Sequence, residues 1–292
     1  MIALIAINNN EHAFYVYNLS KGEIIKKVQA PQEMYDLSSL NKGRPILRPF
    51  GISFDEKIIY VISNSVLGMF DYQYNYLGKF ALNFSVNTHQ ILVQDRKLYV
   101  CQTSKDLLSI INLDNLEQEH YNIIEMRKFE DVDVEVPNYF ELDQKHLNSV
   151  RINKGIMYCS YCGKGSDLNG SELKCYELET KKYIKTLIFS KYPHNIGIID
   201  EKIYTISTYE NSLNTSDGEQ FELNFPGFAR GLAMTKNFAF IGVGGDRNTI
   251  NDGHVLKFDL NQRKVVDIMK VEKSGAITEI RLLNETDYAH KD

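Results

Sequence analysis

The sequence predicts an all-β protein, and more specifically a six-bladed β-propeller with four antiparallel strands in each blade. Three observations favour this fold: one strand pair recurs along the chain, the step of the recurrence matches four strands, and the two ends of the chain complement each other. Four antiparallel strands in roughly every 40–50 residues are typical of propeller blades. We therefore expect one propeller domain that spans residues 1–292.

The recurring element is an aliphatic residue followed eight positions later by an aromatic residue, with a polar turn between them. Four of the five turns read DEK, DRK or NKG, and the turns are flanked by β-branched and aromatic residues. Two such runs joined by a tight turn predict a β-hairpin. The pairs are Ile52–Tyr60, Ile91–Tyr99, Val150–Tyr158, Ile196–Tyr204 and Leu232–Phe240.

A second pair of strand-like runs follows each hairpin, such as DLLSIINLD and EQEHYNII in the second unit. The units start at positions 50, 89, 148, 194 and 230, and a weaker start, ITEIRLL, lies near 278. The mean step is (278 − 50)/5, or about 46 residues, so each unit has the length of a four-stranded blade.

The ends of the chain predict how the ring closes. The last unit supplies a single strand, ITEIRLL, while the first 50 residues supply three more, IALIAIN, AFYVYNL and EIIKKVQ. One C-terminal and three N-terminal strands complete a sixth blade, and this closure leaves no open sheet edge. Two separate β domains are the alternative, but no Pro/Gly/Ser-rich linker divides the chain.

Composition limits the classes of partner and the compartment. The formal net charge of -5 argues against nucleic acid or a membrane surface as the partner, because both favour a basic face. Four cysteines in a chain of this length do not form a disulfide framework. The start, MIALIAINNN, has no positively charged segment or cleavage site, and no apolar run is long enough to span a membrane. We expect a cytoplasmic protein.

One position of the repeat is expected at the mouth of the central channel, because the first strand of each blade lines the channel. We call this position the slot. His146 and Arg48 lie two residues before a slot residue, where strand alternation returns to the same face. Glu279 takes the sixth place if the register is off by one. The slot residues are Phe50, His89, Asn148, His194, Arg230 and Thr278.

Three of the seven histidines, His89, His146 and His194, fall at one end of three consecutive blades. Neutral imidazoles that converge on one axis suit a divalent transition metal such as Zn, Mn or Fe. The alternative is that these side chains hydrogen-bond to loops and water that fill the channel. Arg230 is suited to bind a carboxylate or phosphate of a ligand. The alternative role for Arg230 is a structural ion pair with Glu279 or with an acidic residue in a loop.

Two functions follow from these positions. The first is an enzyme, a lyase or hydrolase that acts on an acidic sugar or another small anionic metabolite. The second is a non-catalytic propeller that binds a protein or a glycan through the same rim. For the enzyme, the expected catalytic residues are Arg230, Glu279 and His146, and the expected substrate-binding residues are Arg48, Asn148, Asn195 and Arg247.

Long polar connections are expected on the same face as the slot, and binding often involves such loops. They include residues 30–48 and 125–148. The acidic stretch Glu130, Asp131, Asp133 and Glu135 could hold a cation, although a solvated loop is the alternative. A glycan-binding rim needs exposed aromatic side chains, and the candidates are Tyr35, Tyr139 and Phe140.

The second half of the chain resembles a family of uncharacterised bacterial propeller proteins, usually labelled conserved hypothetical. The shared sequence motifs are HLNSV, PHNI, PGFARGLA, AFIGVGGDR, which ends at Arg247, and ITEIR, which contains Glu279. They occur in the family's order between His146 and Arg281, about half of the chain. The resemblance implies a propeller with a common rim at these motifs, and it implies no particular reaction.

Overall fold

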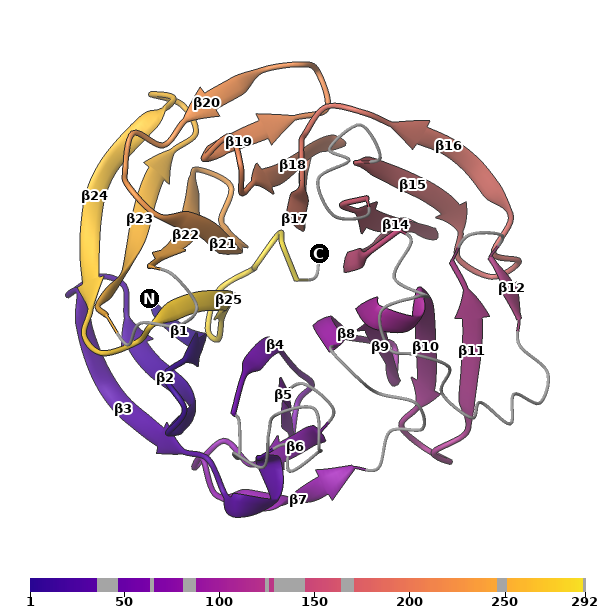
Figure 1. Cartoon of the computed structure of the whole chain (residues 1–292), viewed down its shortest axis with the longest axis horizontal. Coiled ribbons are helices and arrows are strands. Elements are labelled where there is room, and N and C mark those ends of the chain that lie inside the picture. The colour runs from indigo at the N-terminus through magenta and orange to yellow at the C-terminus, as the bar shows by residue number, and fades with distance from the viewer. Residues whose placement is uncertain are drawn as a thin grey trace.

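The computed structural model describes residues 1–35, 47–63, 66–80, 88–123, 126–128, 145–163, 171–245 and 251–290. These residues form six antiparallel sheets arranged in a ring (Figure 1), which confirms the predicted six-bladed propeller. No helix in the described ranges is long and apolar enough to cross a membrane.

The first three blades follow one another along the chain. Blade 1 consists of β4 (Pro49–Phe54), β5 (Ile59–Ser63), β6 (Val66–Phe70) and β7 (Tyr76–Phe80). Blade 2 consists of β8 (Thr88–Gln94), β9 (Lys97–Gln102), β10 (Leu107–Asn112), β11 (Gln118–Asn122) and a fifth, short strand, β12 (Arg127–Lys128). Blade 3 consists of β13 (Leu147–Asn153), β14 (Ile156–Tyr161), β15 (Glu172–Glu177) and β16 (Tyr183–Leu187).

The remaining blades complete the ring. Blade 4 consists of β17 (Pro193–Ile199), β18 (Lys202–Ser207), β19 (Ser212–Thr215) and β20 (Gln220–Glu222). Blade 5 consists of β21 (Phe228–Met234), β22 (Phe238–Gly244), β23 (Gly253–Asp259) and β24 (Lys264–Val271). Blade 6 consists of β25 (Ala276–Leu282), β1 (Ile2–Asn8), β2 (His12–Asn18) and β3 (Glu23–Gln29). Among the described residues, two 3-10 turns, η1 (Gln32–Met34) and η3 (Thr103–Lys105), lie in the connections.

Blade 6 joins the two ends of the chain as the sequence predicted. The C-terminal strand β25 is innermost and pairs with β1, from Ala3 opposite Leu282 to Asn8 opposite Ala276. The strand order β25-β1-β2-β3 therefore combines one strand from the end of the chain with three from its start. The closure of the ring depends on this single sheet.

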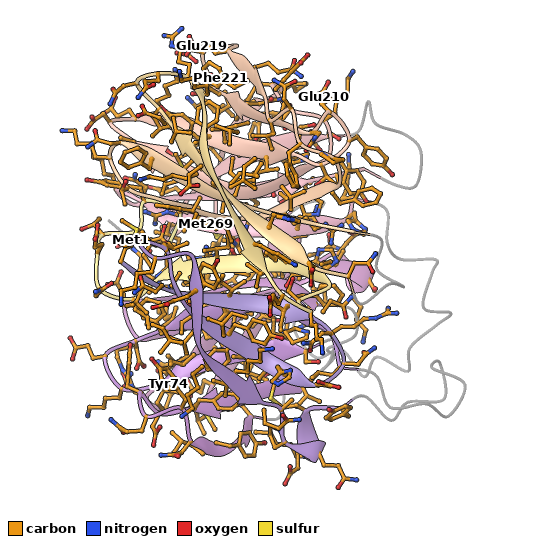
Figure 2. The ribbon with its side chains drawn as sticks, turned by 90° about the vertical axis from the view of Figure 1, so that its left-hand side faces the viewer. Met1, Tyr74, Glu210, Glu219, Phe221 and Met269 are labelled. Atoms are coloured by element: carbon orange, nitrogen blue, oxygen red, sulfur yellow. The ribbon has the colours of Figure 1, made fainter. Side chains whose placement is uncertain are left out.

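The core consists of the seams between blades. The described residues form six hydrophobic clusters, one at each seam between neighbouring blades. The aromatic residues of the repeated pairs contribute to them; Tyr60, for example, packs between blades 1 and 2. At the seam of blades 5 and 6, Met269 of β24 and Met1 belong to one cluster (Figure 2). The inner strands are buried along nearly their whole length because a neighbouring blade covers each face, whereas the outer strands β3 and β24 are largely exposed.

The segment that follows β25 closes one end of the channel, a feature that the sequence did not predict. This segment, residues 283–290, runs from blade 6 to the centre of the ring (Figure 1). Tyr288 pairs with two inner strands, because its N–H donates to the Met234 carbonyl at 2.8 Å and its carbonyl accepts from Ile198 N at 3.0 Å. His290 is fully buried, and its Nε2 lies 2.6 Å from the Ser53 hydroxyl of blade 1. The segment thus contacts blades 1, 4 and 5.

Candidate functional site

Every inner strand is interrupted by a β-bulge at the level of the slot. A bulge sets two residues of one strand against one residue of its partner, so it re-aims side chains and breaks the strict alternation of faces. Two consecutive residues can then face the channel. The register shifts lie at Pro49–Gly51, Thr88–Ile91, Leu147–Ser149, His194–Ile196, Arg230–Leu232 and Ile277–Glu279.

The six slot residues surround one small space, which we call the axial cavity. Its volume is about 20 Å³. The bulges add four residues that directly follow slot residues. The sequence left open whether Thr278 or Glu279 takes the sixth slot position, and the structure shows that both line the cavity. The lining residues are Phe50, His89, Gln90, Asn148, Ser149, His194, Asn195, Arg230, Thr278 and Glu279.

A larger hollow adjoins the axial cavity, and we call it the mouth cavity. Its volume is about 320 Å³, and it shares Phe50, Arg230 and Thr278 with the axial cavity. Tyr209 and Phe228 on its border are 57% and 50% exposed. Arg230 is the one Lys or Arg among the described residues that line either cavity. The other lining residues of the mouth cavity are Asn8, Tyr192, Thr208, Tyr209, Phe228, Gly245 and Ala276.

The Glu279 carboxylate lies in the wall of the axial cavity and is fully buried. Its Oε1 is 2.8 Å from Arg281 Nη1 and accepts a hydrogen bond of 2.8 Å from Asn195 Nδ2. Its Oε2 accepts one of 3.1 Å from Gln90 Nε2. A buried charge needs such partners because burial without them is strongly unfavourable. Glu279 therefore joins blades 2, 4 and 6 at the axis.

The two amides on Glu279 are each held by the next blade. Gln90 Oε1 accepts from Val150 N, and Asn195 Oδ1 accepts from Gly231 N, both at 3.0 Å. Gly231 has a φ of 72°, and a Cβ on it would lie 3.1 Å from the Glu279 backbone. A glycine is needed there, which gives the RGLA motif a structural reason. Further bonds between neighbouring inner strands join Asn195 N to Ser149 Oγ, Val93 N to Ser53 Oγ and Thr278 Oγ1 to the Pro49 carbonyl.

Burial raises the pKa of Glu279 to about 7, and the Arg281 guanidinium opposes this rise. Burial also raises the pKa of Asp287, which lies in the segment that closes the channel. Its carboxylate accepts hydrogen bonds from Met234 N and Leu282 N. A carboxyl that titrates near neutrality in a cavity wall is a candidate for proton transfer.

The raised pKa of Glu279 predicts how stability changes with pH. The folded protein binds this proton more tightly than the unfolded chain, whose Glu pKa is near 4.5. The resulting contribution to the free energy of unfolding is complete below about pH 4.5 and is lost as the pH rises through about 7. Urea unfolding of the wild type and Glu279→Gln between pH 4.5 and 8 checks this. The difference between the two proteins should vary with pH over this window, and a constant difference would contradict the prediction.

The three predicted metal-ligating histidines lie close together. The ring of His89 is 5.2 Å from that of His146, edge to face, and 6.4 Å from that of His194, stacked. The Phe50 ring also stacks on the His89 ring, with the two ring centroids 5.2 Å apart. Within the described ranges, no group of three or more His, Cys, Asp or Glu side chains is arranged to hold a metal ion. The transition metal stays a prediction, and elemental analysis of protein purified without added metal would check it.

The hydrogen bonds of His194 fix its tautomer. Nδ1 lies 3.2 Å from the Tyr192 carbonyl and 2.9 Å from Thr208 Oγ1. The Thr208 hydroxyl donates its one proton to the Ala229 carbonyl at 2.8 Å, so Nδ1 must be the protonated nitrogen. Neutral His194 therefore presents Nε2 as an acceptor, the arrangement that ligating histidines usually have.

The remaining predicted residues have different positions. Neither Arg48 nor His146 is among the described residues that line the two cavities, although the His146 ring contacts His89. The Tyr35 hydroxyl donates to the Asn10 carbonyl. Arg247, the acidic stretch from Glu130 to Glu135, and Tyr139 and Phe140 lie outside the described residues.

Sequence reasoning missed the aromatic border of the mouth cavity. Tyr192 and Phe228 lie two residues before the slot residues His194 and Arg230. The alternation that singled out His146 and Arg48 would have found both of them. Tyr209 follows β18 in a connection between strands, and the repeat contains no signal for it.

Comparisons with known proteins agree with this architecture. No family model matches the chain, and no curated protein matches it. Among solved structures, a nidogen/laminin complex contains a chain with a TM-score of 0.67 and 11% identity, over 96% of this chain and 97% of that one. A protein of unknown function from Bacteroides caccae has a TM-score of 0.62 and 11% identity, with coverages of 97% and 99%. A streptogramin B lyase has a TM-score of 0.50 and 11% identity, with coverages of 77% and 68%. At these identities the similarity shows the fold alone.

Proposed function

We propose that the protein binds a small anionic molecule with a ring, such as an acidic sugar, in the mouth cavity. The observation that carries this proposal is the position of Arg230 at the junction of the mouth and axial cavities, in a cavity that is also lined by aromatic residues. A guanidinium suits a carboxylate because it can donate two parallel hydrogen bonds.

The shape and lining of the mouth cavity support this ligand class. About 320 Å³ falls in the range of small-molecule pockets. Tyr192 and Tyr209 lie edge to face, 4.8 Å apart, and with Phe228 they offer apolar ring surface next to a cation. Such a border favours a ligand that has both a flat apolar face and a negative charge.

Replacement of Arg230 tests the proposal. We expect D-glucuronate to bind the wild type, and D-glucose, which lacks the carboxylate, to bind at least tenfold more weakly, about the effect of one charge-assisted hydrogen bond. Arg230→Met should weaken glucuronate binding by about tenfold to a hundredfold, as measured by calorimetry. Arg263→Met is the matched control, because Arg263 pairs with Glu219 on the exterior and is 61% exposed. Glucuronate and galacturonate that both fail to bind the wild type, or an Arg230→Met variant that binds like the wild type, would overturn the proposal.

An enzymatic form of the same function is favoured by one observation, the pKa of about 7 at Glu279 in the axial cavity wall. In a lyase, a base removes the proton next to the carboxylate and the leaving group departs with its bonding electrons, which leaves an unsaturated acid. Glu279 is the proposed proton-transfer group and Arg230 the clamp. His146, predicted as a third catalytic residue, lines neither cavity and has no part in this form. Proton NMR of a glucuronate that carries a sugar on its 4-oxygen, the leaving group beta to the C5 proton, would reveal the new vinyl proton at C4 after incubation with the protein, and its absence would favour the non-catalytic form.

A further inference from the structure

Asn148 is a buried amide with one unused end. The residue is 1% exposed and lines the axial cavity. Its Nδ2 donates to the Pro193 carbonyl at 3.3 Å and to Cys162 Sγ. The Pro193 carbonyl can only accept, so the amide cannot be flipped. Oδ1 has no hydrogen-bond partner among the described residues.

The other two amides of the axial cavity show why this oxygen is exceptional. Gln90 and Asn195 have the same construction, with one end on the next blade and the other on Glu279. Both ends of each are therefore satisfied within the protein. An unpaired acceptor in a buried site costs roughly 1–3 kcal/mol, so Asn148 Oδ1 calls for a donor that is not among the described residues.

The size and charge of the axial cavity limit that donor. A single water needs roughly 10–15 Å³ of such space, so the volume of about 20 Å³ admits one oxygen-sized group and excludes a carboxylate or a ring. An ammonium donor would lie beside the Arg230 guanidinium and be repelled. The Glu279 charge does not offset this, because the Arg281 guanidinium pairs with it. A water molecule and a ligand hydroxyl remain as the donors that fit, and the experiment below separates them.

We propose that the ligand is a hydroxylated carboxylate, one of whose hydroxyls enters the axial cavity and donates to Asn148 Oδ1. This inference rests on the proposed function, which places the carboxylate of the same ligand at Arg230. The two cavities adjoin at Phe50, Arg230 and Thr278, so one molecule in the mouth cavity reaches both groups. Asn148 then determines specificity, because a site built to bind a hydroxyl rejects the analogue that lacks it.

The experiment compares two six-membered rings that carry a carboxylate, D-glucuronate with hydroxyls and cyclohexanecarboxylate without them. The readout is the preference, the ratio of the two dissociation constants, so general effects of a variant on binding cancel. Asn148→Leu should reduce this preference at least about tenfold relative to the wild type, while cyclohexanecarboxylate binding stays within about twofold. Asn148→Ala, which removes the same oxygen with less apolar bulk, serves if the leucine variant does not fold. Asn214→Leu is the matched control, because Asn214 is a 2% exposed amide on β19 that lines neither cavity.

The outcomes separate this inference from the proposed function. If Arg230-dependent binding of both acids persists and the Asn148 variants keep the wild-type preference, an ordered water satisfies Oδ1 and the inference is overturned alone. If neither acid binds the wild type, the proposed function fails and the inference fails with it. If the preference falls in the Asn148 variants and not in Asn214→Leu, both are supported.

Discussion

A chain that ends at Ala276 is expected to lose the cooperative fold. The truncation removes nearly all of β25, the innermost strand of blade 6 and the partner of β1. It also removes Glu279 from the axis and the segment 283–290 from the end of the channel. Two seams and the axial hydrogen bonds are lost together, so we expect insoluble or partly unfolded protein with no sharp thermal transition.

A deletion of residues 291–292 is the control for this truncation, because it leaves every contact described above in place. Solubility, circular dichroism melting and size exclusion distinguish the two proteins. If the chain that ends at Ala276 melts cooperatively at the temperature of the full-length protein, blade 6 is not needed to hold the ring together, and the closure proposed from the sequence has no energetic importance.

The second large effect is expected at the buried ion pair of Glu279 and Arg281. Both residues are fully buried, and the carboxylate oxygen lies 2.8 Å from the guanidinium nitrogen. At pH 8, where Glu279 is ionised, Glu279→Leu leaves the Arg281 charge buried without its carboxylate, and we expect the free energy of unfolding to fall by about 3–5 kcal/mol. Arg281→Met leaves the opposite charge and should cost a similar amount.

The double variant Glu279→Leu/Arg281→Met is the informative one. It removes both charges, so its loss of unfolding free energy should be smaller than the sum of the two single losses by at least about 2 kcal/mol. The matched control is the exposed pair Lys154–Glu201, whose side chains are 72% and 83% exposed. The double-mutant cycle on that pair should show no measurable coupling. Additive losses at Glu279 and Arg281 would contradict the view that the two residues act as one unit.

The ring and its closure were predictable because seam packing leaves a periodic signal. Five of the six blades have an aromatic residue in the second strand, and Tyr60 and Phe240 fill a seam from this position. This residue recurs at a fixed spacing from the aliphatic residue before it. The slot was predictable for the same reason, since it has a constant offset from that pair.

The parts that escaped prediction break the period. The bulges add a residue on each inner strand, so Gln90 and Asn195 face the axis where simple alternation turns them away. The fifth strand β12 and the segment 283–290 occur once each. Within the segment 283–290, Asp287 and His290 form hydrogen bonds with Met234 and Ser53, which are distant in sequence. Such pairings leave no local pattern in the sequence. The role of Tyr209 depends on a connection whose path the repeat does not determine.

The pairing of β1 with β25 has a consequence for synthesis of the protein in the cell. The strands β1 to β3 leave the ribosome before the other strands of the propeller, but their sheet stays incomplete until β25 has been made. At 5–20 residues per second, the roughly 270 residues between β1 and β25 take about 15 to 50 s to translate. During that time the apolar edge strand IALIAIN has no partner on one side, and exposed edges of this kind promote association between chains. We therefore expect nascent chains to engage chaperones chiefly through this first strand, and expression yield to respond more to substitutions in β1 than to equally buried substitutions in β13.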